Sequence, residues 1–467
     1  MSVARREGER GWGLARGALL ALHAVGPLRH LGMDAWDYDE GPTLQAASLA
    51  LHGARLYRDV PLNKPPLLVM YLHGALRVLG EGLTQGRAAS LLLGVLGLAA
   101  LSSLATAWWG APAGALLLAL LLLVRELPER LAVAMSDLPA LSAAALALAA
   151  AWRARGRAGA GLWGVSGLAL AAAALLHPLL VGVLLPWAMS ARGAPPRRAG
   201  LALATALVTT GAVLAAFPWV DLHRWVVDYN RAPVDALAID GAGVTLRRWL
   251  REDLGWCVAA GLATAWLLAR PETRRATAVS AAWMLVTVLT LRAWRPLWEN
   301  YRVWPEVMLA MPVAGALAQL QGRRRAAWLA LPVAALLAPG PRWPAWTAER
   351  VAARAWIASQ PADVAVLSDD PLLAFAAGRR VPAALADTSW KRVATGYLRL
   401  DEVRAAAGRG RAVAVFATGR FDRLAGMRAW CASRATAVFR AGAVTGYAMD
   451  LRALPPGPSP SMHSGHE

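Results

Sequence analysis

Two acidic side chains and a lysine stand close together between the first two apolar segments of the chain. Asp39 and Glu40 are neighbours, and Lys64 directly precedes Pro65 and Pro66. A carboxylate can take the proton from an attacking hydroxyl group, and a lysine can hold a departing phosphate and stabilise its charge. The plainer alternatives are a solvated acidic pair and a lysine whose ammonium group reaches out to water. Because charges beside a membrane are costly unless they are used, we favour group transfer from an anionic lipid, with Asp39 and Glu40 as catalytic residues and Lys64 at the phosphate.

Further polar residues stand at the ends of later apolar segments. Asp137 begins one such segment, where it can support the acidic pair or cap the helix that follows. His177 lies between two apolar segments, where it can contact a lipid or a metal, or merely end a helix. After Lys64, the second candidate for binding the phosphate is an arginine. Arg231 is our first choice, and Arg224 is the alternative. Tyr301 belongs either to the site or to the aromatic belt of a membrane protein.

The composition is that of a membrane protein with many helical segments. Of the 467 residues, 57% are hydrophobic and only 17% are charged, and the mean hydropathy is +0.40. In lipid the backbone has to satisfy its own hydrogen bonds, so apolar segments of this length are expected to be helices. The net charge of +19 comes mostly from arginines clustered between these segments. Such clusters set membrane topology, so the charge does not predict a nucleic-acid partner. The two cysteines, Cys257 and Cys431, predict no disulfide framework.

The arginine clusters test how many segments cross the membrane. Clusters of positive residues stay on the cytoplasmic side. All of them share one side only if the short segment 66–80, which carries His73 and Arg77, lies in the interface instead of crossing. We therefore predict about eleven transmembrane helices plus juxtamembrane helices, with the first span retained rather than cleaved as a signal peptide. The clusters lie at 5–16, 153–157, 192–198, 270–275 and 323–325, and the apolar segments at 12–31, 66–80, 88–107, 111–124, 138–152, 160–176, 178–191, 199–218, 254–269, 276–291, 304–320 and 326–340.

This topology divides the chain into an all-α transmembrane domain, 1–345, and an α/β domain, 346–453, on the extracytoplasmic side. The first outer loop, 32–87, holds the acidic pair and Lys64, so the chemistry is expected on the extracytoplasmic face of the membrane. The tail, 454–467, is rich in Pro, Gly, Ser and His and is expected to be disordered. Within the α/β domain the patterns predict helices at 348–360, 371–377, 401–407 and 422–431, and strands at 364–367, 412–416, 435–439 and 444–449.

The residues around the acidic pair resemble a known family. Asp39-Glu40-Gly41, Leu56-Tyr57-Arg58-Asp59 and Lys64-Pro65-Pro66-Leu67 are similar to the first outer loop of the polyprenyl-phosphate-sugar glycosyltransferases of superfamily C. The similarity is closest to the bacterial branch of lipid A aminoarabinose transferases and protein O-mannosyltransferases. It spans about residues 12–340 and is strongest over 38–67. Later matches are Ser136-Asp137-Leu138-Pro139, the segment ending in His177-Pro178, where the family usually has Lys in place of His, and Asn300-Tyr301-Arg302.

The resemblance implies a fold, a reaction and a set of site residues. The reaction is transfer of a hexosyl or pentosyl group, with inversion, from a polyprenyl-phosphate carrier to a lipid, glycan or protein acceptor. Asp39 is implied as the catalytic carboxylate with Asp137 supporting it. Lys64 is implied at the phosphate, with an arginine for which Arg231 is our choice. For Tyr57, His177 and Tyr301 we expect contacts with the sugar or the phosphate. Some members of the superfamily use a divalent metal, so Mg²⁺ or Mn²⁺ is a possible cofactor, with Asp39 and Asp137 as its ligands.

Two other classes of protein remain as alternatives. A transporter or flippase of lipid-linked sugars would show inverted repeats and broken helices with charges at mid-span. The sequence shows no internal repeat, and its charges stand at the ends of the segments. A scaffold protein of envelope assembly would have no use for Asp39, Lys64 and Asp137 together. The enzyme is therefore favoured over both.

Overall fold

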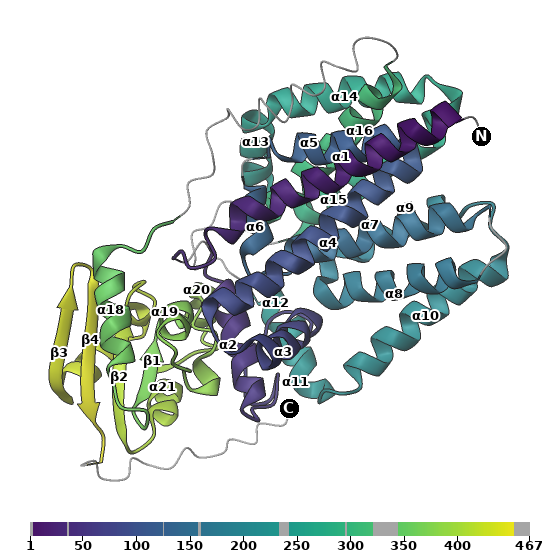
Figure 1. Ribbon diagram of the computed structural model, residues 1–467. Coiled ribbons are helices and arrows are strands. Elements are labelled where there is room, and N and C mark those ends of the chain that lie inside the picture. The colour runs from purple at the N-terminus through teal and green to yellow at the C-terminus, as the bar shows by residue number, and fades with distance from the viewer. Residues whose placement is uncertain are drawn as a thin grey trace.

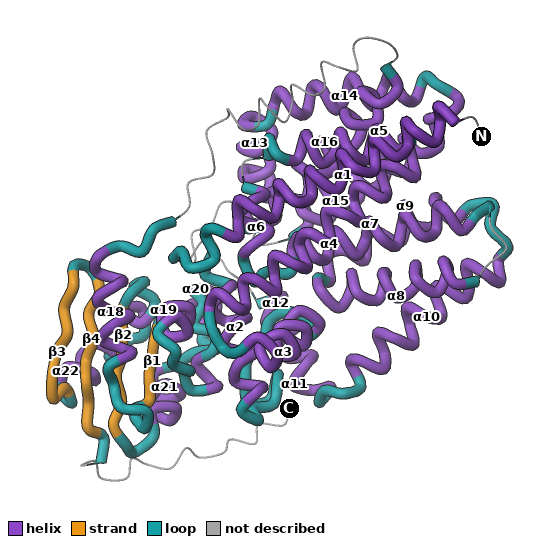
Figure 2. The backbone as a smooth tube through the Cα atoms, viewed as in Figure 1, coloured by secondary structure: helices purple, strands orange, loops and turns teal. Residues whose placement is uncertain are grey.

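The computed structural model describes residues 3–34, 37–124, 126–156, 160–232, 242–294, 297–320 and 344–452. The last predicted apolar segment, 326–340, the arginine cluster at 323–325 and the predicted disordered tail lie outside these residues. The described chain is mostly helical, with one small sheet near its C-terminal end (Figures 1 and 2). Both expectations of fold class, a helical body and an α/β part, are confirmed at this level.

Long apolar helices form the body of the molecule and match the predicted segments closely. Alanine and leucine dominate them and favour helix. Helix α7 lies between α4 and α8 and is buried along nearly all of its length, because its small alanines let neighbouring backbones approach. The helices of the body are α1 (Val3–Leu28), α4 (Leu83–Trp109), α5 (Ala111–Leu121), α6 (Leu127–Ala132), α7 (Asp137–Ala154), α8 (Gly161–Leu176), α9 (Leu184–Ala191), α10 (Pro196–Leu214), α11 (Trp219–His223), α12 (Tyr229–Arg231), α13 (Ala242–Glu252), α14 (Leu254–Leu268), α15 (Pro271–Ala293) and α16 (Val303–Gln319).

Few of the described helices are long and apolar enough to cross a membrane by themselves. Helices α4 and α15 meet both conditions, and α10 with the segment Trp219–Arg231 makes a third span if a pair bent by 107° counts as one. Helices α5, α8 and α14 are apolar but shorter. The helices fit a multi-pass membrane protein, while the number eleven stays a prediction.

Two short helices, α2 (Glu40–Leu51) and α3 (Leu67–Leu79), occupy the first predicted outer loop. Helix α3 has 13 residues, which makes it about 20 Å long, shorter than the roughly 30 Å of a bilayer's hydrocarbon core. Its residues Leu68, Leu72 and Leu76 are buried and recur every fourth position, as expected of one helix face packed on the protein. This length supports the prediction that segment 66–80 does not cross.

The α/β part, residues 344–452, is built on a four-stranded sheet in the order β1-β2-β4-β3. Strands β1 (Ala365–Ser368) and β2 (Arg411–Phe416) pair in parallel, while β4 (Val444–Asp450) runs antiparallel to both β2 and β3 (Ala435–Ala441). Helix α18 (Ala348–Ala358) packs on β3 and β4 (Figure 1). The crossover from β1 to β2 carries α19 (Pro371–Ala376), α20 (Trp390–Ala394) and α21 (Leu400–Ala407).

The predicted elements of this part are confirmed with one exception. The helix predicted at 422–431 is two pieces, a 3₁₀ turn at Phe421–Arg423 and the short helix α22 (Met427–Ala432). Gly426 stands between them with φ +78°. A left-handed backbone at this glycine ends one element and starts the next, so the continuous helix was a wrong prediction.

The α/β part is docked tightly onto helix α2. Gln45 donates from Nε2 to the carbonyl oxygens of Pro371 (3.1 Å) and Arg379 (3.1 Å). A Cβ placed on Gly41 would lie only 2.6 Å from the backbone nitrogen of Leu372, so the glycine is what lets α2 and α19 approach. This contact brings the α/β part beside Asp39 and Glu40 at the start of α2.

Candidate active site

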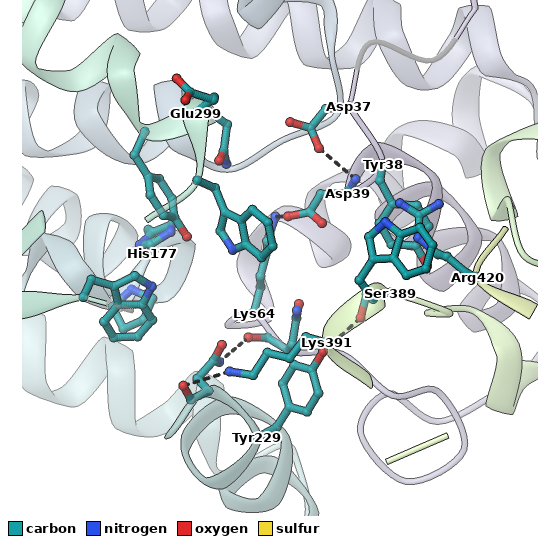
Figure 3. Close-up of a pocket in the computed structure, with 18 residues that line it drawn as sticks. Asp37, Tyr38, Asp39, Lys64, His177, Tyr229, Glu299, Ser389, Lys391 and Arg420 are labelled. Carbon is teal, nitrogen blue, oxygen red and sulfur yellow. Dashed lines mark hydrogen bonds and ion pairs between the residues drawn. The ribbon is translucent and has the colours of Figure 1, made fainter. Parts of the chain in front are cut away.

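A cavity of about 270 Å³ lies where loops of the helical body meet the α/β part. Figure 3 shows its side chains converging from both parts of the molecule. The segment between α1 and α4 supplies Asp39 and Lys64, and the α/β part supplies Lys391 and Arg420. The full lining is Asp37, Tyr38, Asp39, Asn63, Lys64, His177, Pro178, Tyr229, Asn230, Trp294, Trp298, Glu299, Asn300, Tyr301, Ser389, Trp390, Lys391 and Arg420.

Asp39 and Lys64 form an ion pair at the centre of this cavity. The Lys64 ammonium lies 2.9 Å from Oδ2 of Asp39. Burial alone would lower the pKa of Lys64, but the charges of Asp39 and Asp137 outweigh it and raise the pKa to about 12. The lysine is therefore positively charged, and the Asp39 side chain remains about one-third exposed to the cavity. The two residues that the sequence placed at the centre of the chemistry are thus brought together.

Tyr57 does not line the cavity but supports the backbone of Lys64. Its hydroxyl group donates to the backbone carbonyl of Lys64 at 2.9 Å, and its ring packs edge-on against Phe217. Tyr57 has φ +68°, a left-handed conformation that is strained for a bulky side chain. Direct contact of Tyr57 with substrate was our expectation, whereas its position in the structure is that of a support for Lys64.

Asp137, His177 and Tyr301 gather beside the ion pair. Nδ2 of Asn300 donates to the Asp137 carboxylate at 3.2 Å, and Nε2 of His177 lies 3.9 Å from the same carboxylate. The His177 ring packs edge-on against both Tyr301 and Trp304. Burial lowers the pKa of His177 to about 3, so its imidazole is neutral. His177 and Tyr301 line the cavity, whereas Asp137 does not and contacts it through Asn300 and His177.

Glu40 points away from the cavity and into the protein. Its carboxylate receives two hydrogen bonds from the guanidinium of Arg87, from Nε (2.8 Å) and from Nη2 (2.6 Å), and both side chains are fully buried. Arg87 also donates to the carbonyl oxygens of Leu31, Met33 and Asp34. The catalytic role predicted for Glu40 receives no support from this position, since the pair joins helices α2 and α4 to the loop before Asp39.

Arg231 is exposed and does not line the cavity, although its neighbours Tyr229 and Asn230 do. The structure therefore does not bring the arginine chosen from the sequence to the lysine at the centre. The positive charges that do face the cavity from elsewhere are Lys391 and Arg420 of the α/β part.

Sequence reasoning missed these α/β residues because they lie more than 300 positions away from Lys64. One signal was present in the composition. The chain has 49 basic side chains, and only two of them, Lys64 and Lys391, are lysines. Both line the same cavity. Because all the other residues counted as Lys or Arg are arginines, the two lysines stand out in the sequence, and this could have suggested that they act together.

The acidic residues near Lys64 do not fit a divalent metal. Within the described residues, no group of three or more His, Cys, Asp or Glu side chains is placed to hold a metal ion. Asp39 is paired with the Lys64 ammonium, whose charge also acts on Asp137. The two carboxylates proposed as ligands therefore share a lysine where a metal would require further oxygen ligands.

Comparison of sequences places the chain in no family, because no family profile and no curated protein matches it. Comparison of structures does find relatives. ArnT from Cupriavidus metallidurans bound to undecaprenyl phosphate has a TM-score of 0.68 at 15% identity, covering 94% of this chain and 98% of that one. The apo form of the same protein has a TM-score of 0.60 at 15% identity, with 96% and 99% covered.

A third structure is more distant. The Archaeoglobus fulgidus oligosaccharyltransferase, in complex with Zn and sulfate, has a TM-score of 0.50 at 12% identity, covering 94% of this chain and 74% of that one. The resemblance noted in the sequence is thus confirmed at the level of the fold. The chain is folded like ArnT and, more distantly, like the oligosaccharyltransferase.

Proposed function

We propose that this protein transfers a sugar from a polyprenyl-phosphate carrier to a hydroxyl group of an acceptor. The observation that carries the proposal is the ion pair of Asp39 and Lys64 at the centre of a cavity. It is supported by the fold, since ArnT with a TM-score of 0.68 was solved with undecaprenyl phosphate bound. A carboxylate and an ammonium side by side suit a reaction in which a proton leaves one substrate and a phosphate leaves the other.

Asp39 and Lys64 have complementary roles in this reaction. The acceptor oxygen attacks the anomeric carbon, the bond from that carbon to the phosphate oxygen breaks, and the hydroxyl proton passes to Asp39. The phosphate diester, with one negative charge, becomes a monoester with up to two. Lys64 is free to stabilise this added charge at the moment when Asp39 is neutralised by the proton. Direct displacement by the acceptor inverts the anomeric centre.

The surroundings of the pair suit an anhydrous transfer. Tyr57 fixes the backbone of Lys64, and Asn300 fixes the carboxylate of Asp137. Tyr301, Trp294 and Trp298 give the cavity aromatic walls, which suit the face of a sugar ring and exclude water. Exclusion of water favours transfer to the acceptor over hydrolysis.

The setting that we propose is a multi-pass protein of the bacterial cytoplasmic membrane. The cavity and the α/β part would lie on the extracytoplasmic side, as the arginine clusters suggest. The donor would be a polyprenyl-phosphate-linked hexose or pentose, and the acceptor a lipid, a glycan or a protein.

A transporter of lipid-linked sugars is the second candidate, because one observation favours it. The segment Pro196–Leu214 and the segment Trp219–Arg231 meet at 107°, and broken helices are common in transporters. Covalent transfer nevertheless accounts better for Asp39 and Lys64 together, because it needs both a proton acceptor and a cation at the departing phosphate.

A single preparation separates the two functions. The purified full-length protein is placed in liposomes with a radiolabelled polyprenyl-phosphate sugar and an envelope extract as the source of acceptor. The enzyme is expected to move label from the carrier to a product that cannot be extracted with the carrier. Movement of the intact labelled lipid between leaflets, without any covalent transfer, would instead support the transporter.

A further inference from the structure

The two lysines of the chain face one cavity from opposite parts of the molecule. Lys64 comes from the first outer loop, and Lys391 comes from the α/β part, at the start of helix α20. Asn230 links them, because its Nδ2 donates to the carbonyl of Asn63 at 2.8 Å and its own carbonyl accepts from Nζ of Lys391 at 3.0 Å. Figure 3 shows Lys391 beside Tyr229, on the side of the cavity across from Asp37.

The acids of the cavity already have cationic partners. Asp39 is paired with Lys64 and Asp37 with Arg130, at 2.9 Å and 3.2 Å. Glu299 is paired with Arg248. The acidic side chains that line the cavity are thereby neutralised before any ligand enters.

Lys391 and Arg420 are the cations of the lining that have no acidic partner within the described residues. Lys391 is only 7% exposed, and its Nζ makes one hydrogen bond, to Asn230, and lies 5.0 Å from the centre of the Tyr229 ring. Arg420 is 8% exposed, and its Nε is buried without a hydrogen-bond partner. Burying charged groups in this way is costly unless a ligand with the opposite charge completes the site.

Hydrogen bonds within the α/β part fix the backbone on which both cations stand. The buried carboxylate of Asp369 accepts hydrogen bonds from the backbone nitrogens of Ala417 (2.7 Å), Thr418 and Arg420 (3.1 Å), which fixes the loop that carries Arg420. Next to Lys391, the guanidinium of Arg392 donates to the carbonyl oxygens of Ala384, Asp387 and Tyr397. The unpaired charges thus stand on rigid supports, as in a built binding site.

We propose that Lys391 and Arg420, the two cations that the α/β part brings to this cavity, complete with Lys64 the binding site for the carrier phosphate. This inference rests on the proposed function and names the residues that hold its leaving group. A phosphate monoester carries up to two negative charges, and Lys64, once Asp39 has taken the proton, offers only one positive charge. The ammonium of Lys391 supplies the second charge, and its two remaining N–H groups point to no partner in the described residues. The α/β part is therefore a component of the active site.

The rarity of lysine makes a direct test possible. The chain offers an amine reagent only Lys64, Lys391 and the N-terminal amine. The full-length protein in lipid nanodiscs is treated with acetic anhydride at pH 8, and the acetylated peptides are quantified by mass spectrometry. Lys391 should react readily because burial lowers its pKa to about 8, whereas Lys64, with a pKa of about 12, should react little.

The labelling is repeated with undecaprenyl phosphate, with undecaprenol and with inorganic phosphate. We expect undecaprenyl phosphate to reduce acetylation of Lys391 at least about fivefold, because a site that is four-fifths occupied leaves one-fifth of the lysine free to react. Undecaprenol should have no effect. Equal labelling with and without undecaprenyl phosphate would overturn the proposal. Protection by inorganic phosphate at the same concentration would contradict the assignment to the lipid carrier.

Variants separate this inference from the proposed function. Lys391→Met is expected to weaken binding of undecaprenyl phosphate about tenfold or more, which corresponds to the loss of one hydrogen bond to a charged group. Lys391→Arg is expected to retain part of the wild-type affinity. Arg440→Gln removes an exposed charge from strand β3 of the same α/β part and is the control, which should bind normally. If Lys391→Met binds as the wild type does, the inference fails and the proposed function stands. If the wild type binds no undecaprenyl phosphate, both fail.

Discussion

Asp39 and Glu40 are adjacent in sequence and opposite in role. Asp39 faces the cavity and pairs with Lys64, whereas Glu40 turns inward to Arg87. The difference follows from helix geometry, because consecutive residues at the start of α2 point about 100° apart. Two neighbouring carboxylates therefore serve chemistry and stability separately.

The buried pair of Glu40 and Arg87 predicts a large loss of stability on mutation. Glu40→Gln would leave the Arg87 guanidinium buried without a counter-charge, at a cost of about 3–5 kcal/mol. Thermal unfolding in detergent is the measurement, with Asp39→Asn as the comparison, since the Asp39 side chain is one-third exposed. An unchanged unfolding temperature for Glu40→Gln would show that the pair is not a structural anchor.

Lys391 predicts a pH dependence for binding of the carrier phosphate. Its pKa is lowered to about 8 by burial, so its ammonium form, which binds phosphate, is present below pH 8 and lost above it. Two neighbours, Tyr229 and Lys64, do not change protonation in this range. Burial raises the pKa of Tyr229 well above its usual value of 10, and the pKa of Lys64 is about 12.

Affinity for undecaprenyl phosphate should therefore fall between pH 7 and pH 9, by up to about tenfold. The measurement is equilibrium binding to the protein in nanodiscs at each pH. Lys391→Arg should remove this dependence because its guanidinium keeps its charge. The same decline in Lys391→Arg as in the wild type would assign the titration to another group.

At the scale of elements, the contact between α2 and α19 brings the second half of the site into place. Gly41 faces the backbone of Leu372 at a distance that leaves no room for a side chain. Two hydrogen bonds from Gln45, to Pro371 and Arg379, reinforce the contact. The ion pair of Arg350 and Asp34 also joins α18 to the chain before α2. Helix α2 thus presents Asp39 at its start and holds the α/β part by its buried face.

Gly41→Ala is expected to loosen the α/β part without unfolding the helical body. Alanine favours a helix over glycine by up to about 1 kcal/mol, so Gly74→Ala on α3, where a Cβ meets nothing within 4 Å, is a matched control. Hydrogen exchange should quicken in α19 and in helix α20, which carries Lys391, in the first variant only. Equal exchange in both variants would show that close approach at Gly41 is not needed.

The helices and strands were predictable from the sequence where the signal is local. Apolar segments gave α4, α7 and α8, and alternating patterns gave all four strands of the sheet, because side-chain periodicity sets both. The helix predicted at 422–431 failed at Gly426, whose left-handed backbone depends on the turn around it.

The site was predictable only in part, for the same reason. Asp39, Lys64, His177 and Tyr301 meet in one cavity as expected, because they stand at the ends of helices on one side of the body. Arg231 does not line the cavity, whereas Lys391, which the sequence pattern did not single out, does. Docking of the α/β part is a long-range contact that no local pattern reveals.

At the scale of the whole molecule, the cavity lies between two parts of the chain, which must be on the same side of the membrane. The predicted topology places both outside. A reporter enzyme fused after the last residue should therefore be active if it requires the extracytoplasmic side and silent if it requires the cytoplasm. The opposite pattern would reverse the orientation of the cavity.

The central claim is that Asp39 takes the proton from the acceptor. The most direct test compares wild-type protein with Asp39→Asn in transfer from a radiolabelled polyprenyl-phosphate sugar. Loss of the base is predicted to reduce transfer by about 10²–10⁴-fold, and a cooperative thermal unfolding transition of the variant shows that it is folded. Transfer by a folded Asp39→Asn at the wild-type rate would contradict the account.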